Sequence, residues 1–384
     1  MSRFIRHIAF VILLLYPLRS PAQKLNLKIE NQLSGWTTLN FGDPFRYQAG
    51  GRYIPTLNLS DSLKRNQSID AEISVNSFGS ALFEHNRYTD GSAGLKPYRI
   101  WLRYAIPRLE FRVGLQKISF GSASILRPLM WFDKMDFRDP LQLTDGVYSL
   151  LGRYYFQNNA NLWFWALYGN DNTKGWEQVP TQKNIPEFGG RIQLPVPRGE
   201  AAISYHHRKA DFSPYADSLS EITPARYPED RIGIDGKWDL GVGFWIEGVI
   251  KHNGLENALF HEWETYLNLG LDYTFALGNG LNAIMEYFRY NSKADLFQKG
   301  LQGNYNALSV NYPLGLLNNI TLVVYYNWEQ KDWYRFINIQ RKYDYLSLYL
   351  MAFWNPGHFT FYNVSEDRNL FAGKGIQLMA VVNL

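Results

Sequence analysis

Residues 97–120, PYRIWLRYAIPRLEFRVGLQKISF, show most clearly the pattern from which the fold can be predicted. Apolar Ile100 alternates with charged Arg103 before Pro107, and apolar Phe111 alternates with charged Arg112 after it. Successive side chains of a β-strand point to opposite faces of a sheet. The pattern therefore predicts two strands joined by a tight turn, with one apolar and one charged face.

The same alternation recurs along the chain, most clearly at residues 230–240, 265–277 and 375–384. It indicates about eighteen strands of about ten residues, the length that a tilted strand needs to cross a bilayer. Tight turns such as 107–108 and 278–280 alternate with longer connections such as 121–146 and 209–229. We therefore expect an all-β, antiparallel, up-and-down transmembrane barrel with short periplasmic turns and long extracellular loops. A soluble propeller would show self-similar blades, and the sequence has none.

The composition agrees with this prediction. The chain has 384 residues, no Cys, a hydrophobic fraction of 46% and a mean hydropathy of −0.29. After the first two dozen residues no apolar run approaches the roughly 18 residues of a spanning helix, which excludes a helical membrane protein. The absence of Cys excludes disulfides and thiolate nucleophiles or metal ligands.

Aromatic residues are unusually frequent, at 26 Tyr, 24 Phe and 12 Trp. Membrane barrels carry girdles of aromatic side chains at both lipid boundaries. We therefore expect most of these rings, Trp36 and Trp163 among them, to face lipid or its boundary.

The first residues are typical of an export signal. Arg3 and Arg6 precede an apolar stretch at 8–16, and the small residues Ser20 and Ala22 follow it. The apolar run is too short for a membrane anchor, so residues 1–22 are predicted to be a cleaved signal peptide, with 23–384 forming one barrel. Cleavage would remove three Arg and no acid, lowering the formal net charge from +4 to +1. We therefore expect no nucleic-acid partner.

Residues 114–146, GLQKISFGSASILRPLMWFDKMDFRDPLQLTDG, carry a recognisable pattern. A strand ends in Gly-x-Gln with a later Gly, and a loop with aromatic residues, Asp and Asp-Pro follows. Together with the next strand, to residue 156, this region resembles the signature of porin-like outer-membrane β-barrels of poorly assigned function. The resemblance implies a porin-like barrel in outer-membrane lipid, but no particular solute. The last residue is Leu384, whereas many such barrels end in an aromatic residue. The departure affects the end of the chain through which a barrel would be recognised for assembly. The barrel assembly machinery is an expected partner.

The loop at 121–146 is too apolar to extend into water, and a barrel of this size has room inside. We expect it to fold into the lumen, the alternatives being packing over the rim or onto a partner chain. The residues that it would present at a constriction are Trp131, Phe132, Asp133, Asp136, Arg138 and Asp139. The carboxylates could instead cap turns and pair locally, and their spacing is not diagnostic of Ca²⁺. We expect no metal or cofactor.

The polar strand faces predict two charged regions of the lumen wall. A basic wall would comprise Arg99, Arg103, Arg112, Arg153 and Arg191. An acidic wall would comprise Asp235, Asp239, Asp272 and Glu286. Opposed walls would place a transverse field across the pore, unless the charges simply pair between neighbouring strands.

Motifs for catalysis are missing from the sequence. It contains neither Gly-x-Ser-x-Gly nor His-Glu-x-x-His, and His206-His207 is the one adjacent histidine pair. We therefore predict a protein that is not an enzyme. The predicted function is a porin-like channel for passive diffusion of small hydrophilic solutes, located in the outer membrane of a Gram-negative bacterium. The alternative is a sealed barrel that acts as a structural, surface-polysaccharide or secretion-associated scaffold subunit. The sequence leaves the oligomeric state open.

Overall fold

The computed structural model describes residues 26–63, 66–135, 139–213, 226–254, 261–296, 300–357 and 370–384. The predicted signal peptide lies outside these residues. The described chain forms eighteen strands in one sheet. They are β1 (Asn26–Asn40), β2 (Arg46–Leu63), β3 (Gln67–Glu84), β4 (Arg87–Ile106), β5 (Leu109–Gln116), β6 (Val147–Tyr155), β7 (Asn161–Leu167), β8 (Glu187–Val196), β9 (Gly199–Asp211), β10 (Arg226–Asp239), β11 (Gly243–Asn253), β12 (Trp263–Phe275), β13 (Leu281–Lys293), β14 (Leu301–Leu314), β15 (Asn318–Asn327), β16 (Asp332–Lys342), β17 (Leu346–Trp354) and β18 (Lys374–Asn383).

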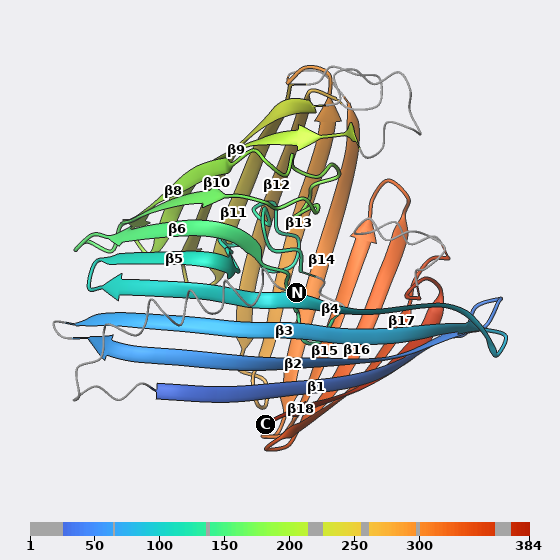
Figure 1. Cartoon of the computed structure of the whole chain (residues 1–384). Helices are drawn as coiled ribbons and strands as arrows, with labels where there is room; N and C mark the ends of the chain where they lie inside the picture. Colours follow the sequence, from blue (N-terminus) through green and yellow to red (C-terminus); the bar gives the residue numbers. More distant parts are fainter. Residues whose placement is uncertain are drawn as a thin grey trace.

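Each strand pairs with its neighbours in the sequence, and the pairing is antiparallel throughout. The sheet closes where β1 pairs with β18, with Trp36 opposite Met379. Figure 1 shows the resulting ring of strands, in which β1 and β18 lie side by side. The predicted antiparallel, up-and-down barrel is therefore confirmed, with eighteen strands. Among the described residues no helix is long and apolar enough to cross a membrane.

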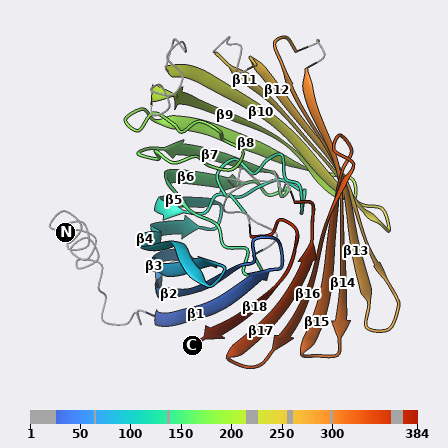
Figure 2. The ribbon, with the colours of Figure 1, turned by 90° about the vertical axis from the view of Figure 1, so that its right-hand side faces the viewer.

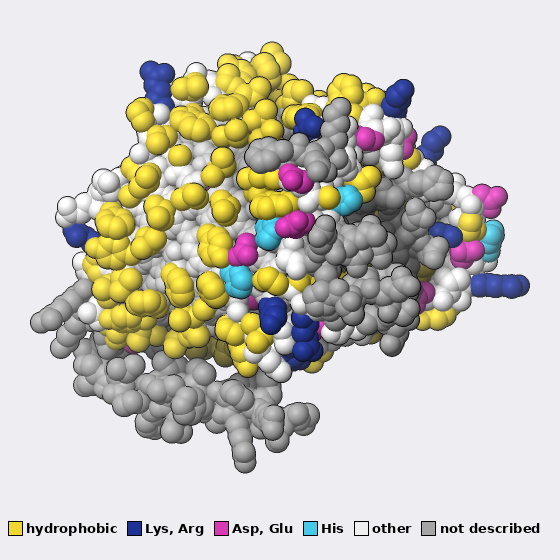
Figure 3. Space-filling view, turned by 90° about the horizontal axis from the view of Figure 1, so that it is seen from above, with side chains coloured by type: hydrophobic (Ala, Val, Ile, Leu, Met, Phe, Trp, Pro, Cys, Tyr) yellow, Lys and Arg dark blue, Asp and Glu magenta, His cyan; other side chains and the backbone are white. Residues whose placement is uncertain are grey.

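Alternation along the strands separates an apolar outer face from a mixed inner one. On β9, Ser204, His206 and Arg208 are buried on the inside, whereas Ile203 and Tyr205 expose 51% and 41% of their surfaces on the outside. Figure 3 shows hydrophobic side chains over a broad area of one outer face. The period-two pattern of the sequence thus produces an outer surface suited to lipid and an interior that holds the charges.

The two ends of the barrel differ. Connections such as 107–108 and 197–198 are tight turns, and the segments 117–146 and 168–186 at the other end are long. At the long-loop end of the outer face, the rings of Phe45, Tyr47, Phe83 and Tyr88 form a chain across β2–β4 with centroid separations of 4.8–6.0 Å. This cluster is the kind of aromatic group expected at a lipid boundary.

Other rings face inward, and for Trp36 and Trp163 the sequence-based expectation is wrong. Trp163 packs against a buried apolar cluster inside the barrel, and Trp36 lies on the inner face of β1 with Ser34 and Thr38. The cluster combines inner side chains of β6, β7 and β11–β17 with the long loop after β5. The physical reason is that part of the lumen is filled with side chains, and this filling requires apolar volume as any core does.

Candidate functional site: a lumen crossed by two loops

Two carboxylates on the inner wall hold the first half of the loop at 117–146. Glu247 on β11 accepts hydrogen bonds from the backbone N–H of Ala123 at 2.6 Å and Leu129 at 3.2 Å. Glu286 on β13 accepts from Ser124, Ile125 and Leu126 at 2.7, 3.0 and 2.6 Å. Both carboxylates are fully buried. An apolar loop segment has backbone donors to satisfy, and these two acids satisfy them.

The apolar side chains of the loop fit a recess in the wall. Gly233 on β10 leaves this space, because a Cβ at that position would lie 2.4 Å from Leu129 Cδ2 and 3.1 Å from the ring of Trp131. Phe132 packs against Trp165 on β7, with centroids 5.6 Å apart. Leu129, Trp131 and Phe132 are each at most 3% exposed. The loop therefore contributes to the core of the barrel.

The second half of the loop returns along another part of the wall. Asp139 lies 3.8 Å from Arg52 on β2, and the carbonyl oxygen of Thr144 accepts a 2.8 Å hydrogen bond from Arg99 on β4. Since the first half contacts β10–β13, the described parts of the loop contact two separate regions of the ring. Figure 2 shows the loops within the ring of strands.

The constriction residues lie in different environments. Trp131 and Phe132 are buried, and Asp133 is 1% exposed and bound to Arg127 at 3.0 Å. Asp139 keeps 26% of its side-chain surface exposed. Asp136 and Arg138 lie outside the described residues. Of the constriction residues among the described ones, Asp139 is thus the one whose side chain stays partly exposed.

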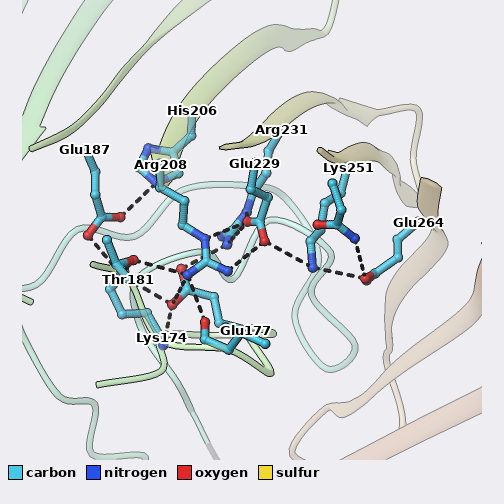
Figure 4. A network of polar contacts seen from close by, with 12 residues as sticks. Lys174, Glu177, Thr181, Glu187, His206, Arg208, Glu229, Arg231, Lys251 and Glu264 are labelled. Carbon is cyan, nitrogen blue, oxygen red and sulfur yellow. Dashed lines mark hydrogen bonds and ion pairs between the residues drawn. The ribbon is translucent and has the colours of Figure 1, made fainter. Parts of the chain in front are cut away.

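A second loop, residues 168–186 between β7 and β8, is fixed to the inner wall by a buried network of ion pairs (Figure 4). Its members are Lys174 and Glu177 from the loop, Glu187 on β8, Arg208 on β9, Glu229 and Arg231 on β10, Lys251 on β11 and Glu264 on β12. We call this set the loop clamp. Every side chain in it is at most 9% exposed.

Glu229 is the centre of the loop clamp. Its carboxylate accepts from Arg208 Nη2 at 2.6 Å and from Arg231 Nε at 2.7 Å, and Lys251 Nζ lies 3.4 Å away. Glu177 joins the loop to the same arginines, at 3.3 Å from Arg208 and 2.9 Å from Arg231. Four acids balance four bases, which is the condition under which buried charges are tolerated.

His206 extends the loop clamp on β9. The indole N–H of Trp165 donates to His206 Nδ1 at 3.2 Å, so this nitrogen is an acceptor. The other nitrogen, Nε2, lies 3.1 Å from Glu187 and therefore carries the proton that it donates to this carboxylate. The ring is thus the neutral tautomer, held between an indole and a carboxylate.

Sequence reasoning missed the loop clamp as a unit. Alternation does place Arg208 and Glu229 on inner faces of their strands, and this signal was available. Lys174 and Glu177 lie in a segment without periodicity, so no pattern could connect them to the wall.

A further group of charged side chains is only partly buried. Arg103, Arg112 and Arg153 converge on Glu110, at 3.3, 3.1 and 3.7 Å. They keep 32%, 20% and 18% of their side-chain surfaces exposed. Three guanidinium groups therefore share one carboxylate, and Arg103 also lies 3.4 Å from Asp70. This arrangement leaves cationic surface facing the lumen.

Tryptophan rings support these arginines. Arg153 lies over Trp163 with its Cζ 3.8 Å from the ring centroid, and Arg112 lies over Trp101 at 4.7 Å. Arg52 lies over Trp36 at 5.4 Å. A guanidinium stacked on an indole is attracted to the ring and held in place by it. We call these residues, with Arg103, the arginine–tryptophan wall.

Uncharged polar side chains line the strands β14–β17. Asn311 donates to Thr321 Oγ1 at 2.9 Å, and Gln340 donates to the hydroxyl of Tyr349 at 3.1 Å. All four are half-buried on inner faces. Figure 2 shows β14 and β15 across the ring from β5 and β6. The lumen is therefore lined by arginines on β2 and β4–β6 and by amides and hydroxyls on β14–β17.

The remaining residues of the two predicted walls are paired. Arg99 is buried against the loop through Thr144, and Asp272 lies 3.6 Å from Lys237. Asp239, at the short-turn end of β10, accepts from the N–H of Gly241 at 3.1 Å. Arg191 and Asp235, assigned to different walls, form a bidentate ion pair with distances of 2.5 and 2.9 Å. The predicted basic and acidic walls therefore meet at this ion pair, because β8 and β10 are only two strands apart.

No protein-family model matches the chain, and no curated protein matches it in sequence. Solved structures do share its fold. One is Pseudomonas aeruginosa OccK5 (OpdH), with a TM-score of 0.56 at 12% identity, covering 94% of this chain and 98% of that one. Another is an anion-selective porin from Comamonas acidovorans, with a TM-score of 0.51 at 10% identity, covering 94% and 100%. Acinetobacter baumannii OccAB1 has a TM-score of 0.52 at 10% identity, covering 94% and 96%. The chain therefore has the fold of outer-membrane porin barrels.

Proposed function

We propose that this protein is an outer-membrane channel through which small hydrophilic solutes diffuse passively. The observation that carries the proposal is the partly exposed arginine–tryptophan wall, which together with the amides and hydroxyls of β14–β17 lines a lumen narrowed by the loop at 117–146. A wall of this kind lets a solute exchange its hydration for contacts with the protein. The apolar outer face supports placement in a membrane, and the likeness to porin structures supports the outer membrane.

The position of the charges favours a channel over a purely structural barrel. In the loop clamp, charges are fully buried and matched one to one. Around Glu110, by contrast, three arginines share a carboxylate and retain exposed surface. An apolar side chain could provide the same packing as these exposed cationic groups. A role in contacting solutes therefore explains the cations better than a role in holding the barrel together.

Reconstitution in planar bilayers tests the proposal. Purified, folded protein should produce stepwise currents that are linear in voltage at low voltage and need no energy source. Liposomes containing the protein should also swell in solutions of small neutral sugars. Bilayers that stay silent with protein shown by circular dichroism to be folded and inserted would contradict a channel.

One observation favours a second candidate, a sealed barrel that serves as a scaffold. The buried apolar cluster extends through loop 117–146 to inner side chains of β16 and β17, where Phe371 of the last loop packs on Phe336 and Phe353. If this filling closed the lumen, the protein would fold and insert without conducting. Absence of current together with a stoichiometric partner recovered from the membrane would favour this candidate.

A further inference from the structure

An open pocket lies on the outer face of the barrel, at the long-loop end of β12–β14. Its volume is about 620 Å³, and it opens away from the lumen. It is lined by Thr265, Tyr266, Leu267, Arg289, Asn291, Lys293, Gly300 and Gln302. Arg289, Asn291 and Lys293 project outward from β13, because they alternate with the buried, inward-facing Phe288 and Ser292. The pocket thus brings two cations and two amides together on the side that faces lipid.

The cations in this pocket have neutral partners. Arg289 donates to Gln302 at 3.3 Å, and Lys293 donates to the carbonyl oxygen of Leu296 at 2.9 Å. Neither forms an ion pair with any acid among the described residues. The nearby carboxylate of Glu329 is engaged by Asn304. Neither positive charge in this pocket is therefore directly paired with a carboxylate, which differs from the matched charges of the interior.

The height of the pocket places it just beyond the apolar belt. Leu271, Met285 and Leu308 lie opposite one another on β12, β13 and β14 and are 46%, 53% and 38% exposed on the outer face. Arg289 is four residues farther along β13 than Met285. At about 3.4 Å per residue and a tilt of about 45°, that separation is about 10 Å along the membrane normal. The cations then lie where lipid headgroups begin.

We propose that this pocket binds the phosphate-bearing headgroup of a glycolipid in the outer leaflet. Arg289 and Lys293 would contact phosphate oxygens, and the amides of Asn291 and Gln302 would contact sugar hydroxyls or further phosphate oxygens. The acyl chains would lie along the apolar outer face below, beside Leu271 and Met285. The proposal relies on the outer-membrane placement but not on conduction through the lumen.

Native mass spectrometry of the detergent-purified full chain tests the site. The probes are lipid A with two phosphate monoesters, the same lipid after dephosphorylation, and inorganic phosphate. The test variant is Arg289→Gln with Lys293→Gln. The matched control is Arg198→Gln with Arg341→Gln, which removes two exposed cations from the short-turn end. We expect wild type and control to bind the phosphorylated lipid about tenfold more tightly than the test variant does. Wild type should also bind the phosphorylated lipid about tenfold more tightly than the dephosphorylated lipid.

Three outcomes would overturn the proposal. Equal binding by the test variant and wild type would show that Arg289 and Lys293 do not form the site. Equal loss of binding in the control would show a nonspecific effect of charge, and inorganic phosphate that binds as tightly as the lipid would show a site for the free anion.

Conductance of the same proteins, recorded in parallel, separates this proposal from the proposed channel. A test variant that loses lipid binding but conducts normally would support the lipid site independently of the channel. A wild-type protein that binds the lipid but does not conduct would contradict the channel and leave the lipid site standing.

Discussion

Glu286 accepts a 2.6 Å hydrogen bond from the backbone N–H of Leu126, 160 residues away in the sequence. Asn268 completes this contact from the neighbouring strand, donating to the carbonyl oxygen of Leu126 at 2.7 Å and to Glu286 at 3.0 Å. One carboxylate and one amide thereby satisfy both backbone groups of a buried loop residue. The position of the loop at 117–146 in the lumen depends on this contact.

Glu286→Gln should loosen the loop. A glutamine presents one carbonyl oxygen, which can accept, and one NH2 group, which cannot accept a hydrogen bond from the loop N–H groups. We expect a loss of about 1–3 kcal/mol in the free energy of unfolding, measured in urea, and faster proteolysis of the loop. Glu200→Gln is the control, because Glu200 is exposed and pairs with Gln193 near the short turns. Equal stability of the two variants would show that Glu286 does not anchor the loop.

Glu229→Gln should destabilise the protein more strongly, because it leaves two arginines and Lys251 without their shared carboxylate. Breaking a buried pair of this kind costs about 3–5 kcal/mol. The matched control is Lys183→Gln, in the loop at 168–186. Lys183 and Asp171 form an exposed pair at 2.6 Å, in which the hydrogen bond from Lys183 lowers the pKa of the Asp171 carboxyl. Urea unfolding should separate the two variants clearly, and a Glu229→Gln protein as stable as the control would contradict the role of the loop clamp.

Gly175→Ala should disturb the contact between the two inner loops. Gly175 has a φ of +46°, and a Cβ there would lie 1.8 Å from the carbonyl oxygen of Met130. Gly169→Ala shares the strain of a positive φ, at +78°, but its Cβ would meet nothing within 4 Å. We therefore expect Gly175→Ala to lower the free energy of unfolding by about 1–3 kcal/mol more than Gly169→Ala. Similar thermal unfolding of the two variants would show that the loops can separate without cost.

Arg112→Glu should change the ion selectivity of the channel. The substitution places a second carboxylate beside Glu110 in the partly exposed wall. The reversal potential in a salt gradient should shift toward cation selectivity, while the barrel remains folded. Arg341→Glu is the control, since Arg341 is exposed on the outer face of β16. A shift of equal size in the control would exclude Arg112 as a determinant of selectivity.

The period-two pattern predicted the barrel because each strand carries its own evidence. Residues such as Ile100 and Arg103 define two faces wherever the strand lies in the ring. Contacts between side chains of different strands are harder to predict. Alternation gives the face on which a side chain lies, but not its height along the barrel. The contact between Arg191 and Asp235 depends on register and on tilt, and the sequence pattern contains neither.

The inner loops show the same limit more strongly. The apolar character of Leu129 and Trp131 correctly indicated that they need a packing surface, and Gly233 provides part of it. Nothing in the sequence relates this glycine to a loop about a hundred residues earlier. Trp131 and Phe132 were also expected at the edge of an opening, yet a residue that packs well enough to hold a loop is removed from the open lumen.

The matched charges of the loop clamp have a consequence for how the protein can vary. Because four acids cancel four bases within a compact, buried cluster, the clamp adds almost no net field to the lumen. The electrical character of the passage then depends on the exposed arginines near Glu110, which are separate from the clamp. Architecture and ion preference are thus carried by different residues, so that one can be redesigned while the other is kept.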